Sequence, residues 1–312
     1  MNLKVLVTGG AGYIGSILVP ELLSDGFEVT VIDNLTYRQN SLSHNFYNKK
    51  FNFIKKDICD YESINKIMTS FDIIIPLAAI VGAPACNENP FKSKIINYDA
   101  QLNLINNLSN EQLLIFPTTN SGYGVGSKSE YCDENSPLNP ISDYAKDKVK
   151  IEKIFMEKGN AISLRLATVF GMSPRMRTDL LVNDFVLKAI KDRSLTLFEE
   201  NFRRNYIHVR DVVKGFKFSI ENSKTMKGQI FNLGLSNANI TKSELAKKIK
   251  QYLPYLYIHS ANIGTDKDKR DYYVSNEKIE KLGWSPSFSL DDGIKELIKG
   301  YDSLIINEHS NI

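Results

Sequence analysis

Residues 4–15 read KVLVTGGAGYIG, an apolar strand that runs directly into Gly9, Gly12 and Gly15. Glycine suits such a turn because a side chain would keep the backbone from turning tightly and from approaching a diphosphate. A helix that begins near Tyr13 would offer free N–H groups and the positive end of its dipole to phosphates. This stretch therefore predicts a phosphate-binding strand–turn–helix unit.

Asp33 is the last residue of the next apolar segment, EVTVID at 28–33. The dinucleotide fingerprint places an acid about 20 residues after its glycines, where the carboxylate holds the adenosine ribose. A carboxylate there would repel a 2′-phosphate, so we expect NAD rather than NADP as the cofactor. The alternative is a solvated acid at the end of a strand.

Two further segments belong to the predicted cofactor site. Asp57 follows the third apolar run and would hold the adenine amino group, or else form the N-cap of a helix before Tyr61. Leu77, Ala78 and Ala79 end the fourth run, where small side chains let a flat ring or a ribose lie close to the backbone. Core packing is the alternative for these three.

Short apolar runs alternate with amphipathic stretches up to about residue 166. The runs predict strands at 5–7, 29–32, 51–54, 73–75, 113–116 and 161–164. The stretches predict helices near 12–23, 61–69, 92–108 and 143–155. Strands that are apolar on both faces and joined by helices favour an α/β fold, with a parallel sheet covered on both sides.

The last third of the chain has a different pattern. Helices are predicted near 179–191, 241–252, 276–282 and 290–301, separated by loops that contain arginine, asparagine and tyrosine. Segments 211–220 and 230–233 are expected to return to the sheet. We therefore expect an NAD-binding domain from 1–166 plus about 207–233, and a smaller substrate domain from 167–206 plus 234–312 that closes a cleft.

The composition is ordinary for a globular protein, with 42% hydrophobic and 24% charged residues among 312. A net charge of +3 gives no argument for nucleic acid or an anionic membrane as a partner. Cys59, Cys86 and Cys132 lack metal-ligand spacing, so we expect no metal site and a reduced, cytoplasmic compartment. The longest apolar run, 73–86, contains prolines and is shorter than the ~20 residues of a membrane span.

Tyr144 and Lys148 lie four positions apart in PISDYAKDK at 140–148, which opens a predicted helix. This spacing places both side chains on one helical face. A tyrosine that acts as a base must lose a proton whose reference pKa is about 10. The Lys148 ammonium and the positive charge of oxidised nicotinamide would lower that pKa in a poorly solvated cleft. We also expect Lys148 to bind the nicotinamide ribose.

Thr119 ends the fifth predicted strand, where its hydroxyl can bridge a substrate oxygen and the phenol of Tyr144. The alternative is a threonine that simply suits a strand. With Lys148, these side chains predict hydride transfer: Tyr144 removes a hydroxyl proton while the hydrogen on the carbon leaves to NAD. The expected catalytic residues are Thr119, Tyr144 and Lys148. The expected cofactor contacts are Gly9, Gly12, Tyr13, Ile14, Gly15, Asp33, Asn34, Asp57, Ile58, Leu77, Ala78, Ala79, Tyr144 and Lys148.

These motifs, in this order, resemble the extended short-chain dehydrogenase/reductase family of NAD-dependent nucleotide-sugar epimerases and dehydratases. The likeness covers nearly the whole chain and includes TGGAGYIG at 8–15, TTNSGYG at 118–124, RLATVFG at 165–171, RRNYIHVRDV at 203–212 and FNLG at 231–234. It implies a Rossmann-type doubly wound parallel sheet with a smaller C-terminal substrate-binding domain. It also implies a nucleotide-sugar substrate and a homodimer.

By position, the resemblance implies substrate contacts at Asn120, Ser121, Asn183, Arg204 and Arg270. The two arginines match residues that hold a diphosphate, which suits a planar guanidinium fork. For each arginine, a surface ion pair is the alternative. Asn183 matches a position that lines the nucleotide pocket.

Departures from the family pattern bear on the reaction. The 4,6-dehydratases carry Asp-Glu directly after the catalytic threonine, as acid and base for eliminating water, where this chain has Asn120 and Ser121. The 3,5-epimerising members carry a cysteine where Ser121 stands. We therefore expect oxidation at a sugar carbon, C4 being the expected position, without loss of water.

Three segments are similar to the GDP-manno-heptose 4-dehydrogenases of bacterial capsule pathways: TTNSGYG, PLAAIVGAPAC at 76–86 and SPRMRTDLLVNDF at 173–185. This resemblance implies a GDP-linked heptose as the substrate and its 4-keto derivative as the product. A 4-epimerase that retains its NAD would use the same residues and stays an alternative. A non-catalytic NAD-binding module is a third reading, against which the presence of both Tyr144 and Lys148 argues.

Overall fold

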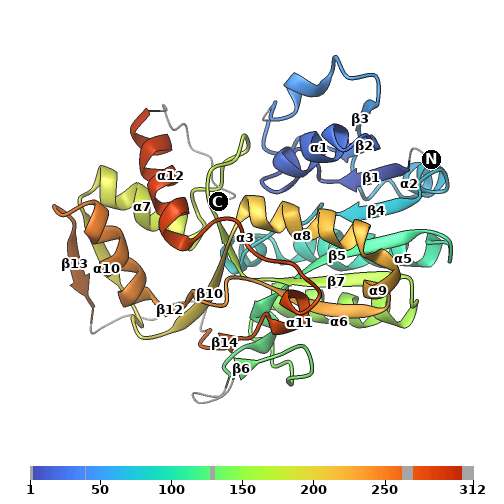
Figure 1. Ribbon diagram of the computed structural model, residues 1–312. Coiled ribbons are helices and arrows are strands. Elements are labelled where there is room, and N and C mark those ends of the chain that lie inside the picture. The colour runs from blue at the N-terminus through green and yellow to red at the C-terminus, as the bar shows by residue number, and fades with distance from the viewer. Residues whose placement is uncertain (1–2, 39, 127–130, 262–269, 304–312) are drawn as a thin grey trace.

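A computed structural model of the chain describes residues 3–38, 40–126, 131–261 and 270–303. Its largest element is a seven-stranded parallel sheet in the order β11-β7-β5-β4-β1-β2-β3 (Figure 1). All six strands predicted from the apolar runs are in this sheet, which confirms the predicted fold class. The seven strands are β1 (Lys4–Thr8), β2 (Glu28–Asp33), β3 (Phe51–Lys55), β4 (Ile73–Pro76), β5 (Leu113–Thr119), β7 (Ala161–Leu166) and β11 (Gln229–Leu233).

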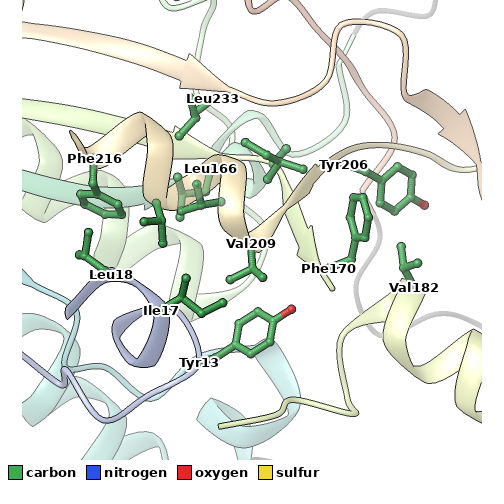
Figure 2. Packing of buried hydrophobic residues seen from close by; sticks show 14 of the residues in the cluster. Tyr13, Ile17, Leu18, Leu166, Phe170, Val182, Tyr206, Val209, Phe216 and Leu233 are labelled. Carbon is green, nitrogen blue, oxygen red and sulfur yellow. The ribbon is translucent and has the colours of Figure 1, made fainter. Parts of the chain in front are cut away.

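Helices cover both faces of this sheet because its strands are apolar on both faces. The helices are α1 (Gly15–Ser24) and α8 (Val209–Glu221) on one face and α2 (Tyr61–Met68), α5 (Ala100–Asn107) and α6 (Asp143–Glu157) on the other. Val5 and Val7 of β1 are fully buried in the first layer, and Leu6 between them is buried in the second. Figure 2 shows the first layer, where Leu18 of α1 lies close to Phe216 of α8.

Most of the other elements form a smaller lobe beside the sheet, on the left of Figure 1. Its strands are β8 (Thr168–Phe170), β10 (Arg203–His208) and β12 (Asn239–Thr241) in one sheet, and β9 (Ser194–Leu197) with β13 (Tyr257–Ser260) in another. A further pair, β6 (Tyr131–Cys132) with β14 (Tyr273–Val274), lies at the bottom of the figure, below the sheet. The main helices of the smaller lobe are α7 (Leu181–Lys191), α10 (Lys242–Tyr252) and α12 (Leu290–Ser303). The short helix α9 (Ser223–Met226) precedes β11 in the chain, and the short helix α11 (Glu277–Glu280) packs against β11. The apolar layer of α1 and α8 continues into this lobe through Phe170, Val182 and Tyr206 (Figure 2).

The helix that the sequence predicts over 92–108 is interrupted in the structure. It consists of α4 (Pro90–Lys94), one π-helical turn η2 (Ile95–Asp99) and α5, and the short helix α3 (Ala83–Glu88) precedes it. Asn97, in the π turn, is buried and accepts from the N–H of Ile80 at 2.9 Å while donating to its carbonyl at 2.8 Å. The irregular turn therefore aims a polar side chain at the loop after β4 and fixes that loop.

The helices of the protein are short. The longest in the described part of the chain are α6, with 15 residues, and α12, with 14. Among the described residues, no helix combines the length and the apolar character that crossing a bilayer requires.

Candidate active site

A cavity of about 740 Å³ lies at the carboxyl ends of the parallel strands, between the sheet and the smaller lobe. Ligands of open parallel sheets bind at this edge, and ligand sites typically measure about 300–1,000 Å³. All the residues predicted to contact NAD line this cavity, together with Thr119, Ser121 and Arg270. The structure thus brings together side chains from the first 148 residues and from the smaller lobe.

Gly9 lies where the end of β1 meets the end of β4. Its φ of 70° is a left-handed conformation that favours glycine. A β-carbon at this position would lie 2.5 Å from the amide nitrogen of Ala78. Glycine is therefore required by the close approach of two strand ends, in addition to the phosphate approach that the sequence predicts.

Asp33 is anchored in the wall of the cavity at the end of β2. Its carboxylate accepts from the N–H of Ala11 at 3.0 Å and from the N–H of Leu35 at 2.8 Å. Burial raises the pKa of this carboxyl, although the two N–H donors act in the opposite direction. An anchored acid of this kind suits the ribose hydroxyls that the sequence assigns to it.

Asp57 belongs to the cavity wall and does not cap a helix. One of its oxygens accepts from the side chain of Asn34 at 2.8 Å and the other from the N–H of Cys59 at 2.9 Å. The N-cap of α2 is Asp60, which accepts from the N–H of Ser63 at 3.3 Å, so the N-cap alternative for Asp57 is wrong. The adenine contact stays a prediction.

The residues present fit NAD as a set. A glycine turn opens helix α1, an acid ends β2, and the small side chains of Ala78 and Ala79 lie at the end of β4. These are the groups that a diphosphate, a ribose and a flat ring need.

Tyr144 and Lys148 both face the cavity from the first two turns of α6. Ser142 caps this helix by accepting from the N–H of Ala145 at 3.3 Å, which fixes where the helix begins. Lys148 is only 3% exposed, and its Nζ donates to the carbonyl of Pro117 at 3.3 Å. The lysine therefore joins α6 to the end of β5.

The pKa of Tyr144 is shifted opposite to the sequence-based expectation. Burial raises the pKa of Tyr144 to about 12, and Cys86 adds to this shift while Arg177 and Arg270 oppose it. Burial also lowers the pKa of Lys148 to about 8. In the protein alone, poor solvation outweighs the effect that we expected from the ammonium, so the phenolate needs a further positive charge.

Thr119 presents its hydroxyl to the cavity next to Ser121. The two side-chain oxygens lie 2.7 Å apart, and the N–H of Ser121 donates to Oγ1 of Thr119 at 3.2 Å. Asn120, in the short 3₁₀ turn η3 (Asn120–Tyr123), lies behind the cavity wall and is 1% exposed. Within the described part of the chain, neither polar atom of its side chain has a hydrogen-bond partner.

Two more of the predicted substrate contacts lie outside the cavity wall. Asn183, at the start of α7, accepts from the N–H of Gly171 at 3.0 Å and donates to the carbonyl of Arg177 at 2.8 Å. Because its amide is used within the protein, the structure gives Asn183 a role in holding the 171–177 loop. Arg204, on β10, is 3% exposed and lies beside Tyr206. Burial raises the pKa of Tyr206, and the positive charge of Arg204 opposes this shift without cancelling it.

Several candidate functional residues were missed by the sequence reasoning. Arg175, Arg177 and Tyr272 line the cavity, although they carried no assigned role. Arg177 forms a two-pronged ion pair with Asp179, in which its Nε donates to Oδ1 at 3.1 Å. The sequence signal that could have identified the two arginines is their spacing, two positions apart in SPRMR at 173–177, a segment without regular periodicity. Tyr206 is a further candidate, since its buried hydroxyl has no partner among the described residues.

A buried ion pair anchors helix α6 to the sheet. Glu152, one turn after Lys148 on α6, accepts from Nε of Arg165 at 3.1 Å and from its Nη2 at 2.7 Å. The same carboxylate accepts from the hydroxyls of Thr118 at 2.8 Å and Ser163 at 2.6 Å. Glu152 therefore links α6, β5 and β7 close to Thr119 and Lys148.

Comparisons with known proteins agree with this site. Residues 5–234 match the model of the NAD dependent epimerase/dehydratase family. UDP-glucuronic acid decarboxylase 1 of Arabidopsis thaliana is 30% identical over 98% of this chain and 72% of its own length. A putative UDP-glucose 4-epimerase of Methanocaldococcus jannaschii is 28% identical over 94% of this chain and 97% of its own.

Among solved structures, the UDP-glucose 4-epimerase of Thermus thermophilus, a complex with NAD, superposes with a TM-score of 0.83 at 25% identity. The match covers 97% of this chain and all of the other. This likeness confirms the Rossmann-type fold and agrees with NAD as the cofactor.

Proposed function

The chain belongs to the NAD dependent epimerase/dehydratase family, and from that premise we propose that it oxidises the C4 hydroxyl of a nucleotide sugar. The best candidate substrate is GDP-manno-heptose, which would give the 4-keto sugar. One observation carries the proposal: Thr119, Tyr144 and Lys148 line one cavity, while the residues that follow Thr119 are Asn120 and Ser121. These two neutral side chains lack the carboxyl groups that elimination of water requires.

The side chains divide the reaction between them. When bound, NAD accepts the hydride that leaves C4. Tyr144, as a phenolate, takes the proton of the hydroxyl, and the electron pair of that O–H bond becomes part of the new carbon–oxygen double bond. The hydroxyl of Thr119 holds the same oxygen in place. Lys148 supplies positive charge to the phenolate.

Burial makes the positive charges of the site important. Because the pKa of Tyr144 is raised to about 12 by burial, the phenolate forms only when cations near it compensate for the lost solvation. Arg177 and Arg270 already act in this direction. A poorly solvated site strengthens each of these interactions relative to water.

The substrate assignment is supported by where three unusual segments meet. Residues from 77–85, 118–121 and 175–180 line the cavity, and they belong to the segments that resemble the GDP-manno-heptose 4-dehydrogenases. The named relatives carry UDP-sugar activities in their names, so the nucleobase is the part of the proposal that most needs testing. In this proposal the enzyme works in the cytoplasm as a homodimer, and its three free cysteines suit that compartment.

The test is to incubate the protein with GDP-manno-heptose and excess NAD, and to follow reduced cofactor by absorbance and the product by NMR. We expect a 4-keto sugar and an equal amount of reduced cofactor. UDP-glucose serves as the comparison substrate, and Tyr144→Phe as the inactive control. If no GDP-sugar gives a keto product, the proposal fails.

A 4-epimerase is the second candidate, favoured by the similarity to UDP-glucose 4-epimerases. The same three catalytic residues would then return the hydride to the other face of the sugar. Interconversion of two C4 epimers without accumulation of reduced cofactor would decide for this reaction.

A further inference from the structure

Residues 171–180 form a segment, here named the strap, that leads from β8 to α7 and lies against the glycine turn. The hydroxyl of Tyr13 donates to the carbonyl of Gly171 at 2.6 Å, and the hydroxyl of Ser173 donates to the carbonyl of Tyr13 at 2.7 Å. The hydroxyls of Ser16 and Ser173 lie 2.8 Å apart. The smaller lobe is therefore bound directly to the turn that opens α1.

The strap places a buried arginine in the wall of the cofactor cavity. Arg175 is 2% exposed and lines the cavity together with Tyr37 and Asp33. Its guanidinium carbon lies 4.0 Å from the centre of the Tyr37 ring, a cation–π contact. Burial lowers the pKa of Arg175, and the nearby Arg177 adds to this effect. Tyr37, Asp179 and Asp33 act in the opposite direction and offset part of the cost of this buried charge.

We propose that Arg175 binds the adenosine half of NAD, so that the smaller lobe supplies a cofactor contact beside the glycine turn. The position of the residue supports this: Asp33, Asn34 and Asp57 line the same end of the cavity. The charge supports it as well, because the diphosphate is the anionic part of the dinucleotide. A planar guanidinium can pair with two phosphate oxygens while its face remains on the Tyr37 ring.

This assignment gives the strap a consequence for cofactor exchange. Release of NAD would require Arg175 to move, and the strap is held at both ends by its bonds to Tyr13 and by the amide of Asn183. The cofactor is accordingly enclosed by both lobes, and loss of the Arg175 contact opens one side.

The experiment compares Arg175→Met with the wild-type protein, since methionine keeps an apolar stem and removes the charge. We expect less NAD in the purified variant. After removal of the cofactor, the Kd for NAD and for ADP-ribose should rise about 10- to 100-fold in calorimetric titrations. Affinity for nicotinamide mononucleotide should not change. Arg193→Met is the matched control, because Arg193 is exposed, lies 5.2 Å from the Tyr255 ring and is outside this cavity.

Wild-type affinity of Arg175→Met for ADP-ribose would overturn the proposal. If that variant is less stable than the wild type without NAD, Arg175→Lys decides the question. An ammonium retains the charge but neither forms a two-pronged pair nor stacks on the ring. A folded Arg175→Lys protein with weakened ADP-ribose binding supports the proposal, and one with wild-type binding contradicts it.

Discussion

Nζ of Lys148 donates a hydrogen bond to the carbonyl oxygen of Pro117 at 3.3 Å, two residues before Thr119 in strand β5. The same nitrogen lies 4.6 Å from the centre of the Phe116 ring. The lysine is thereby fixed to the strand that carries the hydroxyl of Thr119. Tyr144, one helical turn earlier on α6, takes its position from the same anchor, so the three side chains proposed to be catalytic share one rigid support.

Tyr144→Phe removes the proposed base and leaves the ring in place. We expect sugar oxidation to fall by about 10²- to 10⁴-fold, the range for loss of a general base. The NAD content of the purified protein should stay close to that of the wild type, since the glycine turn and Asp33 are untouched. Steady-state rates and cofactor content, measured on one preparation, check both parts. Unchanged oxidation would exclude Tyr144 as the base.

Lys148→Met should stabilise the NAD-free protein at neutral pH while inactivating it. Burial lowers the pKa of Lys148 from 10.5 to about 8. Between these values the unfolded chain binds a proton that the folded chain has released, so stability of the wild type rises as the pH increases through this window. At pH 7 the variant should gain up to about 3 kcal/mol in free energy of unfolding, and the gain should shrink toward pH 10.

Melting temperatures of the two proteins across this pH range measure that difference. A variant that is no more stable than the wild type at pH 7 would show that the buried ammonium carries no such cost. The activity of the variant serves as the internal check that the lysine is needed for oxidation.

Glu152→Gln should destabilise the protein and slow catalysis together. Removing one partner of a buried ion pair costs about 3–5 kcal/mol, because Arg165 would keep an uncompensated charge. The rate should fall because Thr118 and α6 lose their common anchor. Glu62→Gln is the control: Glu62 is 82% exposed and pairs with Lys66 at the surface, so its loss should cost less than about 1 kcal/mol. Equal melting temperatures for the two variants would contradict this role of Glu152.

Asn120→Leu tests whether the buried amide serves the substrate or the fold. A buried amide without partners costs about 1–3 kcal/mol, so the apolar variant should be as stable as the wild type or more stable. If Asn120 contacts the sugar, KM for the nucleotide sugar should rise about 5- to 100-fold while NAD affinity is unchanged. A KM equal to that of the wild type would remove Asn120 from the substrate contacts.

The parts of the fold that depend on local pattern were predictable from the sequence. Val5 and Val7 indicate a buried strand, and the glycines that follow indicate the turn, because each signal lies within a few residues of its effect. The interruption at Asn97 was not predictable in this way. Asn97 in this π-helical turn is hydrogen-bonded to Ile80, which lies in another segment of the chain.

In the site too, residues with a local sequence signal were predictable, and residues placed by contacts with distant segments were not. Asp33, Tyr144 and Lys148 reach the cavity as predicted, because each has a defined place at a strand end or on the first turns of a helix. Arg175 comes from an irregular loop, and only the packing of that loop against Tyr13 and Ser16 brings it to the cofactor side. The raised pKa of Tyr144 could not be predicted from the sequence either, since burial is a property of the whole fold.

The most direct test of the central claim is the mass of the nucleotide-sugar product after incubation with GDP-manno-heptose and excess NAD, read together with the amount of reduced cofactor. Oxidation at C4 by Tyr144, without elimination, predicts a product lighter by two hydrogens and one reduced cofactor for each molecule formed. A product lighter by one water would contradict the account, as would an unchanged GDP-sugar pool with no reduced cofactor.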